Sequence, residues 1–109
     1  MANEYKILGQ SNPAATTLTD VLTVGSGKQI IVSTITVANL ENAANTYRIA
    51  VRDGGASIDN AHYVAYDTTV SANDAVALTL GITLGATDVV FVYASDTNLA
   101  FNIYGVEIS

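Results

Sequence analysis

Hydrophobic and polar residues alternate with a period of two along most of the chain, in short segments bounded by Gly, Asn and Asp. Successive side chains of a strand point to opposite sides of a sheet, so this alternation is typical of half-buried β-strands. Residues 46–52 show it most clearly. Tyr47, Ile49 and Val51 point to one side, and Arg48, Ala50 and Arg52 point to the other. The pattern predicts strands at residues 5–8, 18–24, 28–38, 46–52, 62–67, 75–80, 88–95 and 98–108.

These segments make about eight strands with turn signals at roughly 8–12-residue spacing, which is typical of a sandwich or barrel. No segment keeps the period of an amphipathic helix over the length of an ordinary helix. We therefore expect an all-β protein in which residues 1–109 form a single small antiparallel β-sandwich or jelly-roll-like barrel. Residues 81–87 are expected to be a connector, and Gly105 is expected to mark a bulge. The third strand is expected to place Ile31, Ser33, Ile35 and Val37 on one face.

Composition excludes several classes of protein. The chain has no Cys, which excludes disulfide scaffolds, Cys-based zinc sites and Cys nucleophiles. No window has the roughly 18 uncharged apolar residues of a membrane span, and the first residues do not have the pattern of a signal peptide. The formal charge of -6 argues against a nucleic-acid partner, which Lys and Arg would contact. Since 50% of the residues are hydrophobic and only 13% are charged, we expect part of the apolar surface to contact other chains.

Few residues could carry chemistry. His62 is the only imidazole, so a Ser-His-Asp triad would need it, with Asp67 as the carboxylate. The Gly-x-Ser-x-Gly turn that presents such a nucleophile is absent, and the Gly-rich turn at residues 25–27 does not fit a phosphate-binding loop. The calcium-loop motif is absent too, although a calcium site built from several strand ends stays open. We expect no enzyme, no catalytic residue, no cofactor and no metal.

The tyrosines and arginines in the strands are the candidate contact residues. Arg48 and Arg52 lie about 13 Å apart on one face of a strand. Two interpretations are open: an ion pair with a neighbouring subunit, or no such contact, with the arginines either solvated on the surface or paired within the chain to Asp67 or Asp53. Tyr63 and Tyr66 are separated by an odd number of positions, so one should be exposed or buried against another chain. The predicted interface consists of Tyr47, Arg48, Arg52, His62, Tyr63 and Tyr66, with a carbohydrate-binding face as the rival interpretation.

Several segments, in this order, carry a resemblance to a known family. They are residues 5–11 (YKILGQS), 32–37 (VSTITV), 47–52 (YRIAVR), 62–67 (HYVAYD), 78–84 (LTLGITL) and 101–105 (FNIYG). Over nearly its whole length the chain resembles a small virion protein of tailed phages, notably phages of cyanobacteria and other aquatic bacteria. Members of this family are described as structural or tail proteins.

The resemblance implies a non-enzymatic structural protein located in the virion and assembled in the host cytoplasm. The position we expect is that of a head decoration (cement) protein, a homotrimer that stabilises the lattice of the major capsid protein. The alternatives are a protein of the tail, neck or fibre, and a module that binds glycans on the host surface. No nucleic-acid or membrane partner is expected.

Overall fold

The computed structural model describes residues 2–109, and they form nine strands and two short 3-10 turns. The strands are β1 (Asn3–Ser11), β2 (Thr19–Thr23), β3 (Gln29–Asn39), β4 (Asn45–Arg52), β5 (Tyr63–Val70), β6 (Ala75–Leu78), β7 (Ile82–Leu84), β8 (Val89–Ala94) and β9 (Leu99–Ile108). The turns η1 (Asp53–Gly55) and η2 (Asn60–His62) lie between β4 and β5. The predicted all-β class is confirmed, and each predicted strand overlaps a strand of the structure.

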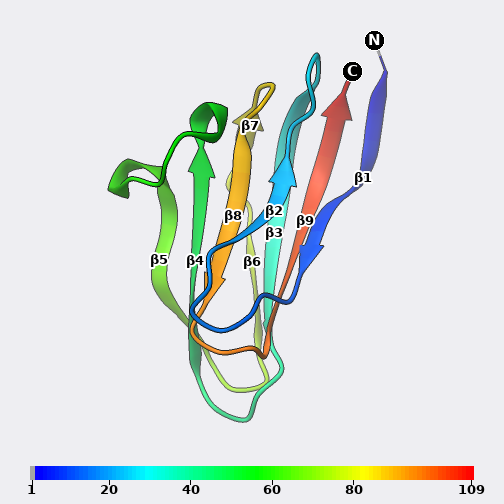
Figure 1. Cartoon of the computed structure of the whole chain (residues 1–109). Helices are drawn as coiled ribbons and strands as arrows, with labels where there is room; N and C mark the ends of the chain where they lie inside the picture. The colour runs from blue at the N-terminus through cyan, green and yellow to red at the C-terminus, as the bar shows by residue number, and fades with distance from the viewer. Residues whose placement is uncertain (1) are drawn as a thin grey trace.

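The strands form two antiparallel layers that face each other, as Figure 1 shows. Sheet A has the order β1-β9-β3-β6, with β7 also paired to β3, and sheet B has the order β2-β8-β4-β5. The pairing is nested: the first strand pairs with the last, the second with the last but one, and β4 pairs with β5. When β6 and β7 are counted as one interrupted partner of β3, this is the topology of a jelly roll.

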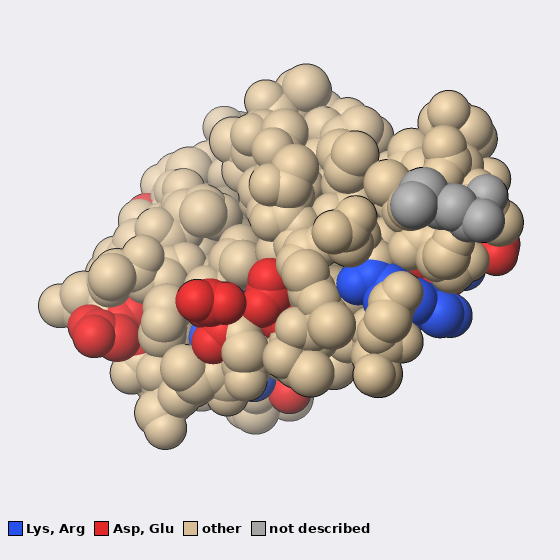
Figure 2. All heavy atoms as spheres, turned by 90° about the horizontal axis from the view of Figure 1, so that it is seen from above, with Lys and Arg blue, Asp and Glu red and all other residues tan. Residues whose placement is uncertain are grey.

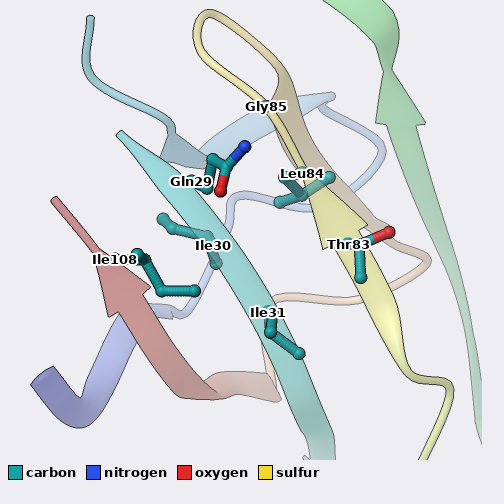
Figure 3. A pocket seen from close by; sticks show the side chains of 7 residues that line it. All are labelled: Gln29, Ile30, Ile31, Thr83, Leu84, Gly85 and Ile108. Atoms are coloured by element: carbon teal, nitrogen blue, oxygen red, sulfur yellow. The ribbon is translucent and has the colours of Figure 1, made fainter. Parts of the chain in front are cut away.

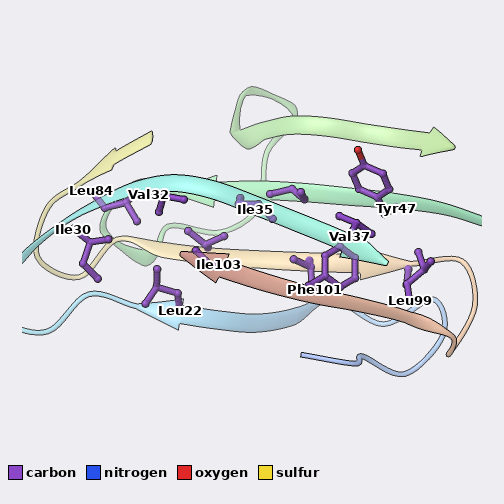
Figure 4. Packing of buried hydrophobic residues seen from close by; sticks show 14 of the residues in the cluster. Leu22, Ile30, Val32, Ile35, Val37, Tyr47, Leu84, Leu99, Phe101 and Ile103 are labelled. Atoms are coloured by element: carbon purple, nitrogen blue, oxygen red, sulfur yellow. The ribbon is translucent and has the colours of Figure 1, made fainter. Parts of the chain in front are cut away.

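The core lies between the two sheets, as Figure 4 shows, and both layers contribute aliphatic side chains to it. Sheet A provides Ile35, Val37 and Ile103, and sheet B provides Ile49 and Val90, all of them fully buried. The two largest aromatic side chains of the core, Tyr47 and Phe101, meet edge to face with ring centroids 6.2 Å apart. Burial of these β-branched and aromatic residues is the main force that holds the layers together.

Strand β3 corrects the predicted face. Ile35 and Val37 point into the core as expected, but Ile31 is 40% exposed and its neighbours Ile30 and Val32 are buried instead. The reason is a β-bulge, because β3 has one extra residue, Ser33, between its pairings to Gly105 and Tyr104 of β9. One extra residue reverses which side chains face the core.

Two further differences concern short elements. Residues 82–84, predicted to be part of a connector, form strand β7 on the edge of sheet A, where three residues pair with β3. A three-residue strand is too short to show alternation in the sequence. His62, predicted to be in a strand, ends the turn η2, and the strand begins at Tyr63.

Gly105 lies at the register change of β3, between the pairings to Gly105 and Tyr104, and the register change of β1 lies one residue further, between the pairings to Tyr104 and Ile103. The extra residues belong to the neighbouring strands and not to β9, where the bulge was predicted. Strand β1 has its extra residue at Leu8 and β3 has its extra residue at Ser33. A Cβ atom on Gly105 would overlap the carbonyl oxygen of Ile31. The bulged strands therefore pack against a backbone that has room only for glycine.

Candidate functional site

The outward face of sheet B brings together most of the predicted interface residues. Strands β8 and β4 turn Val89, Phe91 and Ala50 away from the main core, yet all three are buried. Side chains from the same face cover them: Arg48, Arg52, Tyr63, Tyr66 and Tyr93. We call this set of eight residues the arginine–tyrosine cluster.

Arg48 is the centre of the cluster. Its guanidinium lies between two aromatic rings, 4.1 Å from the centroid of Tyr66 and 4.3 Å from that of Tyr93. It also donates two hydrogen bonds to Asp67, from Nε at 2.7 Å and from Nη2 at 3.2 Å. The hydrogen bond from Arg48 lowers the pKa of the Asp67 carboxyl and the same bond raises the pKa of Arg48. The planar guanidinium thus joins stacking and ion pairing within one chain.

Arg52 covers the other end of the cluster. Its guanidinium lies 5.0 Å from the ring centroid of Phe91 and donates from Nη2 to the carboxylate of Asp20 at 3.0 Å. The sequence left open whether the two arginines pair within the chain or with a neighbouring subunit. Both pair within the chain, Arg48 with Asp67 as one alternative had it, and Arg52 with Asp20 rather than Asp53.

Tyr63 and Tyr66 contact each other, with ring centroids 4.9 Å apart and planes at 88°. The odd spacing had predicted opposite faces, and that prediction is wrong. Strand β5 has an extra residue at Val64, between its pairings to Ala50 and Ile49, and this bulge places both rings on the outward face. Tyr66 is 55% exposed, as expected for one of the pair. Together with Asn60 the two rings line a hollow of about 400 Å³.

Two predicted interface residues have other roles. Tyr47 is 1% exposed and belongs to the core, so it is not available at a surface, and burial raises the pKa of its phenol. The physical reason is the alternation itself, which points Tyr47 away from Arg48. His62 is half-buried, and its Nδ1 accepts a hydrogen bond from the backbone N–H of Asp59 at 3.0 Å, closing the turn η2.

The outward face of sheet A is a second candidate surface, which sequence analysis missed. Pairing across β1, β9, β3 and β7 places Tyr5, Val106, Ile31 and Thr83 in one row. Tyr5 is 80% exposed, Ile7 in the next row is 54% exposed, and Ile31 is 40% exposed. We call the outward residues of sheet A the neutral face. Its more apolar half contains Tyr5, Ile7, Ile31, Tyr104, Val106 and Ile108, with the uncharged polar residues Asn3, Gln29, Thr34 and Thr83 among them. Its other half includes Gln10, Thr36, Ala38, Ala75, Ala77, Ala100 and Asn102.

No charged side chain among residues 2–109 lies on the neutral face. The charged residues of these strands point to the opposite side. There the Nζ atoms of Lys6 and of Lys28, which directly precedes β3, lie 3.2 and 3.5 Å from Oε1 of Glu107. The hydrogen bond from Lys6, with the nearby charge of Lys28, lowers the pKa of Glu107. Figure 2 shows the sandwich from above relative to Figure 1, and most of the visible charged atoms lie in a band across the middle of this view.

A hollow of about 320 Å³ lies at one end of the neutral face, between β9, β3 and β7, as Figure 3 shows. Ile108, Ile31 and Thr83 line it from the three strands. Tyr5 stands on β1, on the other side of the same face. The neutral face thus has a projecting aromatic ring on one side and an apolar hollow on the other.

The sequence of β1 contains the alternation that produces this face, but alternation alone does not show which side of the strand points outward. In β1 the charged residues Glu4 and Lys6 alternate with Tyr5 and Ile7. Amphipathic strands usually turn the apolar side inward, but here Lys6 is on the inner side and Tyr5 is on the outer side. The register of β1 against β9, which the sequence does not reveal, decides between the two.

Within residues 2–109, no group of three or more metal-ligating side chains could hold an ion, and no helix is long and apolar enough to cross a membrane. Asp67 is the carboxylate that a triad with His62 would need, and both of its carboxylate oxygens accept hydrogen bonds from Arg48. No family model, no curated protein and no solved structure matches this chain.

Proposed function

We propose that this chain is a non-enzymatic structural protein of a tailed-phage virion. The position that we favour is a head decoration (cement) protein that stabilises the lattice of the major capsid protein. The observation that carries the proposal is the neutral face, where Tyr5, Ile7 and Ile31 are exposed together and no charged side chain of residues 2–109 interrupts them. Contiguous exposed apolar surface on a small protein marks a site of contact with another macromolecule.

Two further observations support an assembly role. The jelly roll recurs in viral capsid domains, which is an argument from analogy of fold. The resemblance of the sequence to small virion proteins is independent of that analogy. The arginine–tyrosine cluster, in contrast, pairs each guanidinium with a carboxylate of the same chain, although the buried Nε of Arg52 has no hydrogen-bond partner.

The proposal is tested by locating the protein in purified virions of the phage that encodes it. A density map should show the jelly roll on the head, in a copy number that matches the capsid lattice. A low copy number at the tail, neck or fibre would support that alternative position instead. Absence of the protein from the particle would contradict the proposal.

Addition of the purified protein to heads that were assembled without it tests the decoration role directly. We expect the protein to bind these heads and to raise the temperature at which they disrupt, because ligands that bind only the assembled state stabilise it by mass action. Failure to bind intact heads would exclude the decoration role while leaving a tail position open.

A host-surface glycan-binding module is the second candidate function, and one observation favours it. Tyr63 and Tyr66 meet at right angles beside Asn60 and line an open hollow, and an exposed ring with a nearby amide suits a sugar. A glycan array would detect such binding. If a glycan binds and the Tyr63→Ala, Tyr66→Ala double variant retains it, this hollow is not the site.

A further inference from the structure

We propose that the neutral face is covered by the neutral face of a second copy of this chain. The two apolar halves meet, and Tyr5 of each copy lies over the hollow beside Ile31, Thr83 and Ile108 of the other. The inference goes beyond the proposed function: it assigns the exposed apolar face to a contact between copies, so a contact of the dimer with the capsid lattice would use another surface. It is tested on the purified protein without any virion.

The distribution of charge favours a second copy as the occupant. Each chain carries a formal charge of -6, so two copies repel each other at most orientations. The neutral face is the place where two identical acidic molecules can approach without facing carboxylates. A basic partner would be recognised by acidic side chains, and within residues 2–109 this face has none. Tyr5 and Ile7, in contrast, are exposed, and contact with any apolar surface, including the same face of a second copy, would bury them favourably.

The area of the face is sufficient for a specific dimer. Four strands at about 4.8 Å spacing and ten residues at about 3.4 Å each give a face of roughly 650 Å² per copy. Two such faces bury about 1,300 Å² in total, which lies in the lower part of the range for specific interfaces, roughly 1,200–2,000 Å². An interface at the lower end of this range supports a reversible dimer, although area alone does not set its dissociation constant.

The shape of the face is self-complementary about a twofold axis that runs along the strands. This axis exchanges the β1 side of one copy with the β7 side of the other. It therefore brings the projecting ring of Tyr5 opposite the hollow beside Ile31 and Thr83, and the exchange occurs twice. An axis across the strands would instead place the apolar half against the half that carries Ala77, Ala100 and Asn102. Burial of apolar surface favours the first arrangement.

The first test is the molar mass in solution over a range of concentrations, by light scattering or sedimentation. The unchanged chain should move from one chain to two as concentration rises. Tyr5→Glu should raise the dissociation constant at least tenfold, because each copy would bury an unpaired carboxylate in the hollow. Leu40→Glu is the matched control, since Leu40 is 65% exposed in the turn after β3 and lies outside the face. It adds the same charge and should leave the dimer intact.

Tyr5 is 80% exposed, so its substitution should leave the folded monomer unchanged, which the circular dichroism spectrum verifies. A chain that stays monomeric at high concentration would overturn the proposal. So would a dimer that Tyr5→Glu and Leu40→Glu weaken equally. A mass of three chains, as expected from the sequence resemblance, would exclude the twofold contact.

The second test determines the arrangement, and it uses the absence of cysteine from the chain. A mixture of Tyr5→Cys chains and Thr83→Cys chains should be joined by a bis-maleimide whose spacer matches the roughly 10 Å between packed sheets. A mixture of Tyr5→Cys and Leu40→Cys chains should stay unjoined. Efficient joining of Tyr5→Cys chains to one another, without joining to Thr83→Cys, would overturn the proposed axis.

Failure of this inference and failure of the proposed function are distinguishable. A monomer that binds heads would keep the virion role and remove the dimer. A protein that dimerises but is absent from virions would keep the dimer contact and remove the virion role.

Discussion

At the scale of single residues, the two arginines of β4 show how a chain with few charges uses them. The Arg48 guanidinium lies over the rings of both Tyr66 and Tyr93 and donates two hydrogen bonds to Asp67. Arg52 covers the ring of Phe91 in a similar way. Each guanidinium therefore shields apolar surface on the outward face of sheet B while its charge stays paired. A cationic side chain without a planar group would keep the charge paired but would not shield the apolar surface in this way.

Replacement of Arg48 by Lys tests this dual role. Lysine keeps the positive charge but loses the planar group that stacks on both rings and donates twice to Asp67. We expect Arg48→Lys to lower the free energy of unfolding by about 1 kcal/mol. Chemical unfolding in urea measures the change.

Asp67→Asn is the matched control for this measurement. It removes the charge of the partner and leaves the guanidinium between its two rings. Because Asp67 lies on the surface, where ion pairs contribute little, its substitution should have the smaller effect. If Asp67→Asn destabilises the protein as much as Arg48→Lys, the stacking is not what matters.

At the scale of elements, β-bulges decide which side chains reach which surface. Strands β1, β3 and β5 each have at least one extra residue relative to a neighbour. The bulge at Ser33 turns Ile31 outward onto the neutral face, and the bulge at Val64 brings Tyr63 and Tyr66 to the same side. Both candidate surfaces therefore depend on residues that break the period of two.

Gly105 marks the point where this irregularity is accommodated. A Cβ atom there would overlap the Ile31 carbonyl oxygen of the adjacent strand, which is backbone and has little freedom to move. We expect Gly105→Ala to lower the free energy of unfolding by at least ~3 kcal/mol, or to prevent folding, because the clash separates two paired strands. Thermal unfolding and the yield of soluble protein measure the effect.

Gly25→Ala is the control for that prediction. An added Cβ atom at Gly25 would lie 3.4 Å from the Cδ atom of Lys28, a flexible and half-exposed side chain. This substitution should change stability by no more than about 0.5 kcal/mol. A Gly105→Ala variant as stable as Gly25→Ala would show that β3 and β9 can separate at little cost.

At the scale of the whole molecule, β1 pairs with β9 along its full length, and the carboxylate of Asp88 connects two loops by hydrogen bonds. The backbones of Ala2 and Ser109 exchange hydrogen bonds at 2.9 and 3.0 Å, so β1 and β9 are paired to their ends. Asp88 accepts hydrogen bonds from the N–H groups of Gly54 at 2.7 Å and Gly85 at 2.8 Å. These two bonds tie the turn η1 and the loop before β8 to one carboxylate.

Stability should therefore fall in acid. The hydrogen bonds from Gly54 and then Gly85 lower the pKa of Asp88 in the folded state. A group with a lowered folded pKa contributes stability above its unfolded pKa, near 3.9, and loses that contribution as the pH falls through the folded value. We expect the free energy of unfolding to stay level from about pH 7 to pH 5 and to decline below about pH 4.

Asp88→Asn isolates the contribution of this carboxylate. The amide has one acceptor oxygen for the two backbone N–H groups, so the variant should be less stable at neutral pH. Its stability should also decline less steeply below about pH 4, since one titrating group is gone. Urea unfolding across the pH range measures both. Parallel curves for the variant and the unchanged chain would contradict the assignment.

The strands and the all-β class were predictable from the sequence because alternation is a local property. Residues 46–52 show this, since their pattern alone separates the core side of Tyr47 and Ile49 from the outer side of Arg48. The same pattern places Tyr47 on the side opposite Arg48, so the prediction of both residues at one interface conflicted with the alternation. The structure adds that Tyr47 packs against Phe101 of sheet A. The alternation also missed β7, whose three residues pair with β3 only through tertiary contact.

The sequence by itself determined where the strands lie, how apolar the chain is and that Arg48, Arg52, Tyr63 and Tyr66 are unusual among its residues. Only the tertiary structure decided which faces are covered. The pairing of β1 with β9 joins residues at the two ends of the chain, and it turns Tyr5 outward and Lys6 inward. Register between distant strands depends on bulges and on packing of the whole core, which no local pattern encodes. For that reason the neutral face, on which the proposed assembly depends, emerged only from the fold.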